Sequence, residues 1–206
     1  MTASLGQILT DKVNEPDRII LASGSPRRKE LMANAGYRFE VIIPHCSVEE
    51  SINRSLTPIE FVREAAYRKA EAIAKEINAS AIVIAADTVA SCDKEILGKP
   101  RDRVDAKRML KLMSGRLHDV YTGVSIWHRP SNRHITHVET TQLQMKNLQH
   151  DKLEAHLDSG DWVGKAGAFG FQDGLDWVSV VSGLESNVVG LPIEILSELI
   201  EQVTQS

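Results

Sequence analysis

The stretch Ser80–Ala86 limits the possible folds more than any other part of this chain. Its sequence, SAIVIAA, is apolar at both odd and even positions, so a strand formed there buries both of its faces. Such a strand belongs in the middle of a sheet that helices cover on both sides. The chain is therefore expected to be an α/β protein, with a mixed twisted sheet and flanking helices.

Hydrophobic periodicity and turn residues divide the chain into alternating segments. Residues 1–17 are expected to be a leader, and residues 18–206 a single domain. The first two strands enclose a helix and should be parallel, whereas the two longest strands should form an antiparallel hairpin. The predicted strands are 18–22, 38–43, 80–86, 88–92, 95–97, 117–128, 134–145 and 176–182. The predicted helices are 26–36, 57–78, 102–115, 150–157 and 193–203.

Composition excludes several classes of protein. Of 206 residues, 42% are hydrophobic and 25% are charged, which is typical of a globular protein. The net charge of -4 argues against a general binder of nucleic acid or membrane surfaces, because such binding needs a broad basic face. No apolar run is long enough to span a bilayer and no signal peptide is visible, so a cytoplasmic location is expected. Cys46 and Cys92 lack metal-type spacing, and we interpret the scattered histidines as surface or packing residues.

An anion site is predicted where the first strand meets the first helix, in the stretch 21–31, LASGSPRRKEL. Pro26 suits the first turn of a helix, with Ser25 as its cap. Arg27 and Arg28 then lie in that turn, where the helix dipole disfavours cations unless an anion binds there. The alternative is that the two arginines are solvated or paired with nearby acids. The expected cradle comprises the backbone amides and hydroxyls of Ser23, Gly24 and Ser25 with the two guanidinium groups.

Asp87 follows the central strand directly. If that strand is parallel to the first one, Asp87 and the loop 23–28 emerge at the same edge of the sheet, where open α/β sheets bind ligands. Asp87 could instead cap a helix or form a turn.

Two lysines are candidates to join this site. The helix 57–78 begins with a capping box, and Lys69 can lay its stem along the inner face with its ammonium at the edge. Lys99 precedes Pro100, which favours an extended loop from which a lysine could reach a phosphate. The surrounding residues lack the glycine run of a Walker loop.

Five stretches in order resemble the Maf family of nucleotide pyrophosphatases. They are LASGSPRRKEL at 21–31, VEE at 48–50, AADT at 85–88, LGKPRD at 97–102 and GKAGAFGFQ at 164–172. The resemblance implies a Maf/ITPase-like fold with two lobes around a central cleft. It also implies hydrolysis of a nucleoside triphosphate to the monophosphate and pyrophosphate, helped by a divalent cation. A homodimer is plausible from the resemblance.

The resemblance also implies roles for individual residues. Arg27, Arg28, Lys69 and Lys99 are the cations available to stabilise the departing pyrophosphate. Asp87 matches the proton acceptor of the family, and Glu50 with Asp87 could hold Mg²⁺ or Mn²⁺. Whether Asp87 acts as base, metal ligand or both is left open by the sequence.

Three positions resemble the branch of the family that acts on dTTP and UTP. Arg27, Thr88 and Gln172 match that branch, whereas the branch acting on 7-methyl-GTP has Trp, Gln and Glu there. A carboxamide at 172 can donate to a pyrimidine O4 and accept from N3–H. Two alternatives remain, namely a 7-methyl-GTP or broad-specificity pyrophosphatase and a non-catalytic nucleotide-binding regulator of cell division. The chain departs from the family pattern near this pocket, at residues 162–164, 173 and 184–185.

Overall fold

The structure is a computed structural model that describes residues 18–45, 52–53 and 55–205. The leader predicted over residues 1–17 and the predicted metal ligand Glu50 lie outside the described residues. Seven strands form one mixed sheet in the order β2-β1-β3-β5-β6-β7, with β4 paired to β3. The strands are β1 (Arg18–Leu21), β2 (Phe39–Val41), β3 (Ala81–Cys92), β4 (Glu95–Leu97), β5 (Leu117–Arg129), β6 (Arg133–Met145) and β7 (Val178–Ser182).

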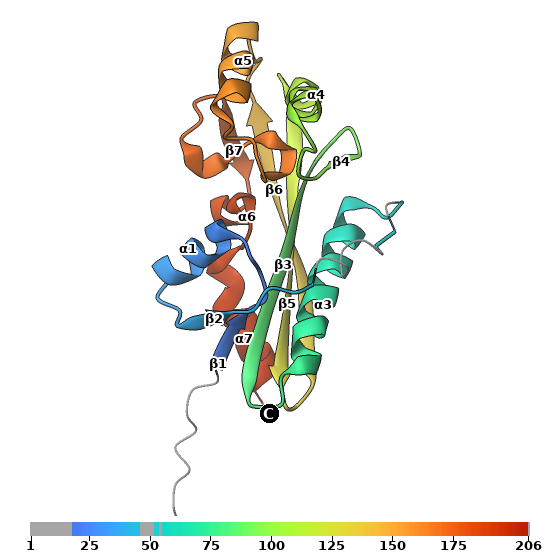
Figure 1. Ribbon diagram of the computed structural model, residues 1–206, viewed down its shortest axis with the longest axis vertical. Helices are drawn as coiled ribbons and strands as arrows, with labels where there is room; N and C mark the ends of the chain where they lie inside the picture. Colours follow the sequence, from blue (N-terminus) through green and yellow to red (C-terminus); the bar gives the residue numbers. More distant parts are fainter. Residues whose placement is uncertain (1–17, 46–51, 54, 206) are drawn as a thin grey trace, which may run out of the picture.

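Helices flank this sheet, which confirms the predicted fold class. Figure 1 shows β3, β5 and β6 running through the length of the molecule, with α3 on one side of its lower half and α1, α6 and α7 on the other. The α-helices are α1 (Pro26–Asn34), α3 (Pro58–Glu76), α4 (Arg103–Met113), α5 (His150–Ser159), α6 (Glu185–Val189) and α7 (Leu196–Thr204). Three short 3₁₀ turns are η1 (Ala166–Ala168), η2 (Phe171–Asp173) and η3 (Ile193–Ile195). None of the helices in the described ranges combines the length and apolar character needed to cross a membrane.

The opening of the chain forms the predicted parallel unit. β1 pairs in parallel with β2 and with β3, and α1 connects β1 to β2. The helix α3 begins at Thr57, whose hydroxyl accepts from the Glu60 backbone while the Glu60 carboxylate accepts from the Thr57 backbone. This capping box confirms the predicted start of that helix. The long antiparallel hairpin of β5 and β6 is confirmed as well.

One strand differs from the prediction in a way that matters for the site. The strand predicted to end at Ala86 continues through Asp87 and Thr88 to Cys92, so the placement of Asp87 beyond a strand end is wrong. Antiparallel pairing with β5 along residues 81–91 holds this segment extended despite its polar residues. Asp87 is therefore neither a helix cap nor a turn residue.

Both faces of the first half of β3 are buried, as the apolar run predicts. Ile82, Ile84 and Ala86 pack in a cluster that includes residues of α1 and α7. Ala81, Val83 and Ala85 pack on the other face against α3.

A third cluster lies in the upper half of the molecule in Figure 1 and is built from α4, α5 and the ends of β3, β5 and β6. The clusters on the two faces of the first half of β3 form one lobe, and the third cluster forms the other. The long strands run through both lobes, in agreement with the expected two-lobed form.

Candidate active site

A gap along one edge of β3 creates the site. On that edge β1 pairs with residues 81–84 and β4 with residues 90–92, so residues 85–89 face no strand within the described sheet. β1 ends at Leu21, opposite Ile84, and the loop that follows it therefore lies beside Asp87 and Thr88. The predicted meeting of the arginine-bearing loop with Asp87 is confirmed, but it occurs in the middle of a strand.

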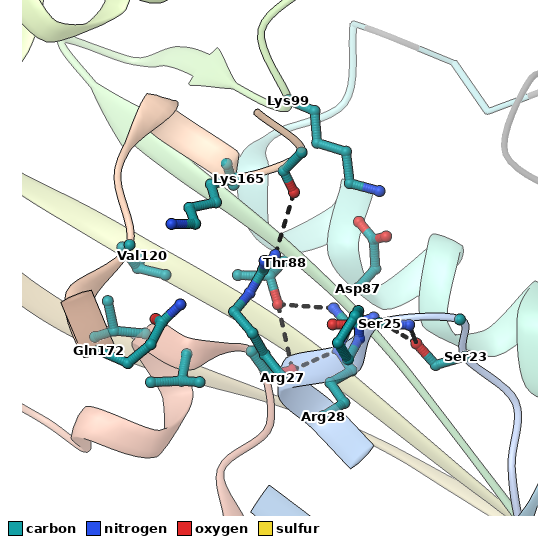
Figure 2. Close-up of a pocket in the computed structure, with 18 of the residues that line it drawn as sticks. Ser23, Ser25, Arg27, Arg28, Asp87, Thr88, Lys99, Val120, Lys165 and Gln172 are labelled. Atoms are coloured by element: carbon teal, nitrogen blue, oxygen red, sulfur yellow. Dashed lines mark hydrogen bonds between the residues drawn. The ribbon is translucent and has the colours of Figure 1, made fainter. Parts of the chain in front are cut away.

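The gap opens into a cavity of about 640 Å³. Its walls come from the loop and first turn of α1, from α3 and β3, and from segments 163–172 and 188–190. All the site residues predicted within the described part of the chain line it: Ser23, Arg27, Arg28, Lys69, Asp87, Thr88, Lys99 and Gln172. Figure 2 shows Asp87 and Ser23 on one side of Arg27, with Gln172 on the other. A second cavity of about 570 Å³ shares Asp87, Thr88 and Lys99 with the first.

An ion pair holds the Asp87 carboxylate. Lys69 Nζ lies 2.6 Å from Asp87 Oδ1, and their side chains are only 11% and 15% exposed. The residue opposite Asp87 on β5 is Gly123, where a Cβ would overlap the Val62 carbonyl oxygen of α3. The missing side chain lets α3 lie directly on the sheet, so the Lys69 stem is buried and its ammonium reaches the gap.

Arg28 joins three separate segments of the chain around the cavity. Its Nε donates to the Gly190 carbonyl at 2.7 Å, one terminal nitrogen donates to Ser23 Oγ at 3.1 Å, and the other donates to Thr88 Oγ1 at 3.0 Å. Thr88 in turn lies 2.9 Å from Thr122 Oγ1. Arg28 therefore fixes the geometry of the loop and of the Thr88 hydroxyl in addition to contributing charge.

Arg27 reaches across the cavity. Its guanidinium donates to the Gly164 carbonyl at 3.2 Å and so connects α1 to the segment that carries Gln172. Ser25 occupies the predicted cap position of α1, but its side chain makes no capping hydrogen bond. Ser23 Oγ instead accepts from the Ser25 backbone at 3.3 Å.

Sequence reasoning missed Lys165, which also lines the cavity. It forms an ion pair with Asp173, directly after Gln172. The stretch 164–172 was given as a motif that resembles the family, but no role was assigned to its lysine. Gln172 is exposed, and its carboxamide has no hydrogen-bond partner within the described ranges, which leaves it open to a ligand.

Two buried histidines pack against the segment 165–172, in agreement with their interpretation as packing residues. His156 is 8% exposed and its Nε2 lies 2.9 Å from the Ala168 carbonyl oxygen. His118 is 3% exposed and packs edge-on against Phe169, a cavity residue. Burial lowers the pKa of His118 to about 4, so its ring is neutral at physiological pH.

The charges of the cavity suit a polyphosphate. Among its described lining residues Asp87 is the sole carboxylate, whereas five side chains are cationic: Arg27, Arg28, Lys69, Lys99 and Lys165. The described residues contain no cluster of three or more His, Cys, Asp or Glu that could hold a metal ion. A single carboxylate fits Mg²⁺ or Mn²⁺, since Mg²⁺ is usually bound by one or two carboxylates together with substrate phosphates. It does not fit a metal held by protein ligands alone.

Known proteins resemble the chain along most of its length. The profile of the family described as Maf-like protein matches residues 18–203. A dTTP/UTP pyrophosphatase of Rhodopirellula baltica is 50% identical over 192 residues, which cover 93% of this chain and 84% of that protein. A dTTP/UTP pyrophosphatase of Vibrio cholerae is 42% identical over 188 residues, which cover 90% of this chain and 97% of that protein.

A solved structure, the Ham1 protein of Staphylococcus aureus, aligns with a TM-score of 0.39 and 16% identity, over 63% of this chain and 72% of that chain. With a family profile matching residues 18–203 and a relative 50% identical over most of its length, this chain belongs to the Maf-like protein family.

Proposed function

We propose that the protein hydrolyses the α–β phosphoanhydride bond of UTP and dTTP, giving the nucleoside monophosphate and pyrophosphate. The observation that carries this proposal is the single carboxylate, Asp87, held by Lys69 in a cavity whose other charged lining residues are cations. The relatives named dTTP/UTP pyrophosphatase support the same reaction.

The proposed reaction starts from a water molecule beside Asp87. Asp87 Oδ1 is engaged by Lys69, and Oδ2 has no hydrogen-bond partner among the described residues, so Oδ2 is the atom that can accept a proton from this water. The water oxygen forms a bond to the α phosphorus while the bond to the bridging oxygen breaks, and the electron pair leaves on pyrophosphate. Lys69 keeps the carboxylate oriented during the transfer.

The cations act on the leaving group. Arg27 and Lys99 line the cavity and are proposed to contact the β and γ phosphates, where negative charge grows as the bond breaks. Arg28 donates to Ser23 and Thr88 and is proposed to hold the cradle that these residues form. A divalent cation, when bound, would neutralise phosphate charge and could lower the pKa of the attacking water, with Asp87 and Glu50 as its proposed ligands.

The proposed base contact is the exposed Gln172 carboxamide. Its amide can donate to O4 of uracil or thymine while its oxygen accepts from N3–H. Cytosine offers the opposite pattern at these two positions and is matched only when the carboxamide is turned by 180°, so discrimination between the two pyrimidines needs a fixed Gln172 orientation. Guanine would be better served by a carboxylate. A cytoplasmic location, in a reducing compartment, and a homodimeric state remain predictions from the sequence.

Pyrophosphate release from separate nucleotides tests this function. The purified protein is incubated with UTP, dTTP, CTP, GTP or 7-methyl-GTP in the presence of Mg²⁺ or Mn²⁺, with a matched series in EDTA. We expect turnover of UTP and dTTP that EDTA abolishes. Turnover of 7-methyl-GTP alone would support the sibling specificity. Binding without turnover of any nucleotide would support a regulator.

A further inference from the structure

The segment that carries Gln172 is closed into a loop by its own ion pair. The ammonium of Lys165 pairs with the carboxylate of Asp173, eight residues later, and their side chains are 14% and 24% exposed. Inside this loop the backbone N–H of Asp173 donates to the Gly170 carbonyl at 3.1 Å. The ion pair therefore joins the two ends of a segment that carries the exposed Gln172.

Space for this ion pair depends on the residue in the middle of the loop. A Cβ on Gly170 would overlap the Asp173 carboxylate and lie 2.8 Å from Lys165 Nζ. Gly170 has a φ of -117°, which any residue adopts, so the need for glycine there is one of space and not of backbone conformation. The pair thus lies directly over the loop backbone.

The rest of the loop is anchored to both lobes. The Gly164 carbonyl accepts from Arg27, and the Gly167 N–H donates to the Gly98 carbonyl at 3.1 Å. These anchors hold its first half. Beyond Ala168, whose carbonyl lies near His156, Phe171 packs the turn 171–173 against the upper core, and the ion pair ties this turn to the beginning of the loop.

We propose that Asp173 is a positioning residue for substrate specificity, which holds the Gln172 carboxamide toward the base through its ion pair with Lys165. Asp173 does not belong to the described lining of the cavity, so it acts through its neighbours and not by touching the substrate. This inference rests on the proposed function for the identity of the base. It extends that function by explaining what holds the turn from which the exposed Gln172 side chain projects.

A competing assignment makes opposite predictions. If the ammonium of Lys165 served mainly to bind phosphate, Asp173 would act as a competing counter-ion. Removing the Asp173 charge would then strengthen binding of every nucleoside triphosphate, and removing Lys165 would weaken binding of all of them equally. The positioning role instead predicts that both changes act on the choice between bases.

The test is the affinity for non-hydrolysable α,β-methylene UTP and α,β-methylene CTP, measured by calorimetry on the full chain with Mg²⁺. This readout does not require turnover, so the positioning role and the proposed reaction can fail separately. The variants are Asp173→Asn, Lys165→Met and the double variant. The matched control is Asp176→Asn, which breaks the exposed pair of Lys152 with Asp176, whose nitrogen and oxygen are 2.6 Å apart, three residues beyond Asp173.

We expect each single variant to lower the preference for the uracil analogue over the cytosine analogue by about fivefold, the scale of a half-buried ion pair. The double variant should lose no more than either single one, because both remove the same contact. The control should keep the wild-type preference and melting temperature. An unchanged preference in Asp173→Asn, or an equal gain in affinity for both analogues, would overturn the proposal.

Discussion

Replacing Asp87 with asparagine separates the proposed chemistry from binding. The asparagine side chain has nearly the same shape, but its amide accepts a proton far less readily than a carboxylate. It also removes the negative charge that Lys69 contacts at 2.6 Å. The variant should therefore lose turnover while the cavity keeps its shape.

The variant should change three measured quantities. A positioned general base contributes about 10²–10⁴-fold to rate, so kcat should fall by that factor. The hydrogen bond between two charged groups that are 11% and 15% exposed contributes roughly 2 kcal/mol to stability, and its loss should lower Tm by about 4–8 °C for a chain of this size. Affinity for α,β-methylene UTP should change by less than about tenfold, because the other cations of the cavity remain.

The assay combines pyrophosphate release, calorimetry and thermal melting on one preparation. Asp119→Asn is the matched control, since Asp119 lies on β5, accepts from Tyr121 and Gln142, and is absent from the described lining of the cavity. It should keep wild-type kcat. Wild-type turnover in Asp87→Asn would remove Asp87 from the mechanism, and loss of binding together with turnover would mean that its charge serves to hold the substrate complex.

Three further changes probe other parts of the account. Arg28→Lys removes the planar fork that joins three segments, so Tm should fall by about 3–6 °C and kcat/KM should fall for every nucleotide. The control Lys29→Met should change neither quantity. A Tm of Arg28→Lys equal to that of the wild type would contradict the joining role. Gln172→Glu should lower kcat/KM for UTP by about tenfold and raise the ratio of kcat/KM for GTP to kcat/KM for UTP. If this ratio is unchanged in the pyrophosphate-release assay, Gln172 does not select the base. The pKa of His118 is about 4 in the folded protein, against 6.5 for a free ring. On acidification the unfolded chain therefore takes up a proton before the folded chain does. The free energy of unfolding should fall by up to roughly 3 kcal/mol between pH 6.5 and 4. Chemical denaturation of His118→Leu should lack this share of the pH dependence while His150→Leu keeps it; parallel curves for all three proteins would refute the assignment.

Local signals in the sequence predicted much of the fold. The capping box at the start of α3 and the apolar run on β3 each depend on neighbours within a few residues, and both are present in the structure. The site was predicted in outline for a similar reason, since the family motifs name residues that the fold then brings together.

The remaining features depend on contacts between distant residues. Strands were predicted on both sides of Asp87, at 80–86 and 88–92, but not their continuity through it, because the pairing that keeps Asp87 extended comes from β5, more than thirty residues later. The sequence predicted Arg28 either to bind an anion or to be solvated or paired with nearby acids, whereas its acceptors are uncharged oxygens 5, 60 and 162 residues away. The role of Lys165 was hidden because its partner lies in an irregular segment without periodicity.

The position of bond cleavage tests the central claim most directly. UTP is hydrolysed in water enriched in ¹⁸O, and the products are separated and weighed by mass spectrometry. Attack on the α phosphorus by a water beside Asp87 predicts one ¹⁸O atom in UMP and none in pyrophosphate. Label in pyrophosphate with unlabelled UMP, or release of labelled inorganic phosphate with UDP, would contradict the account.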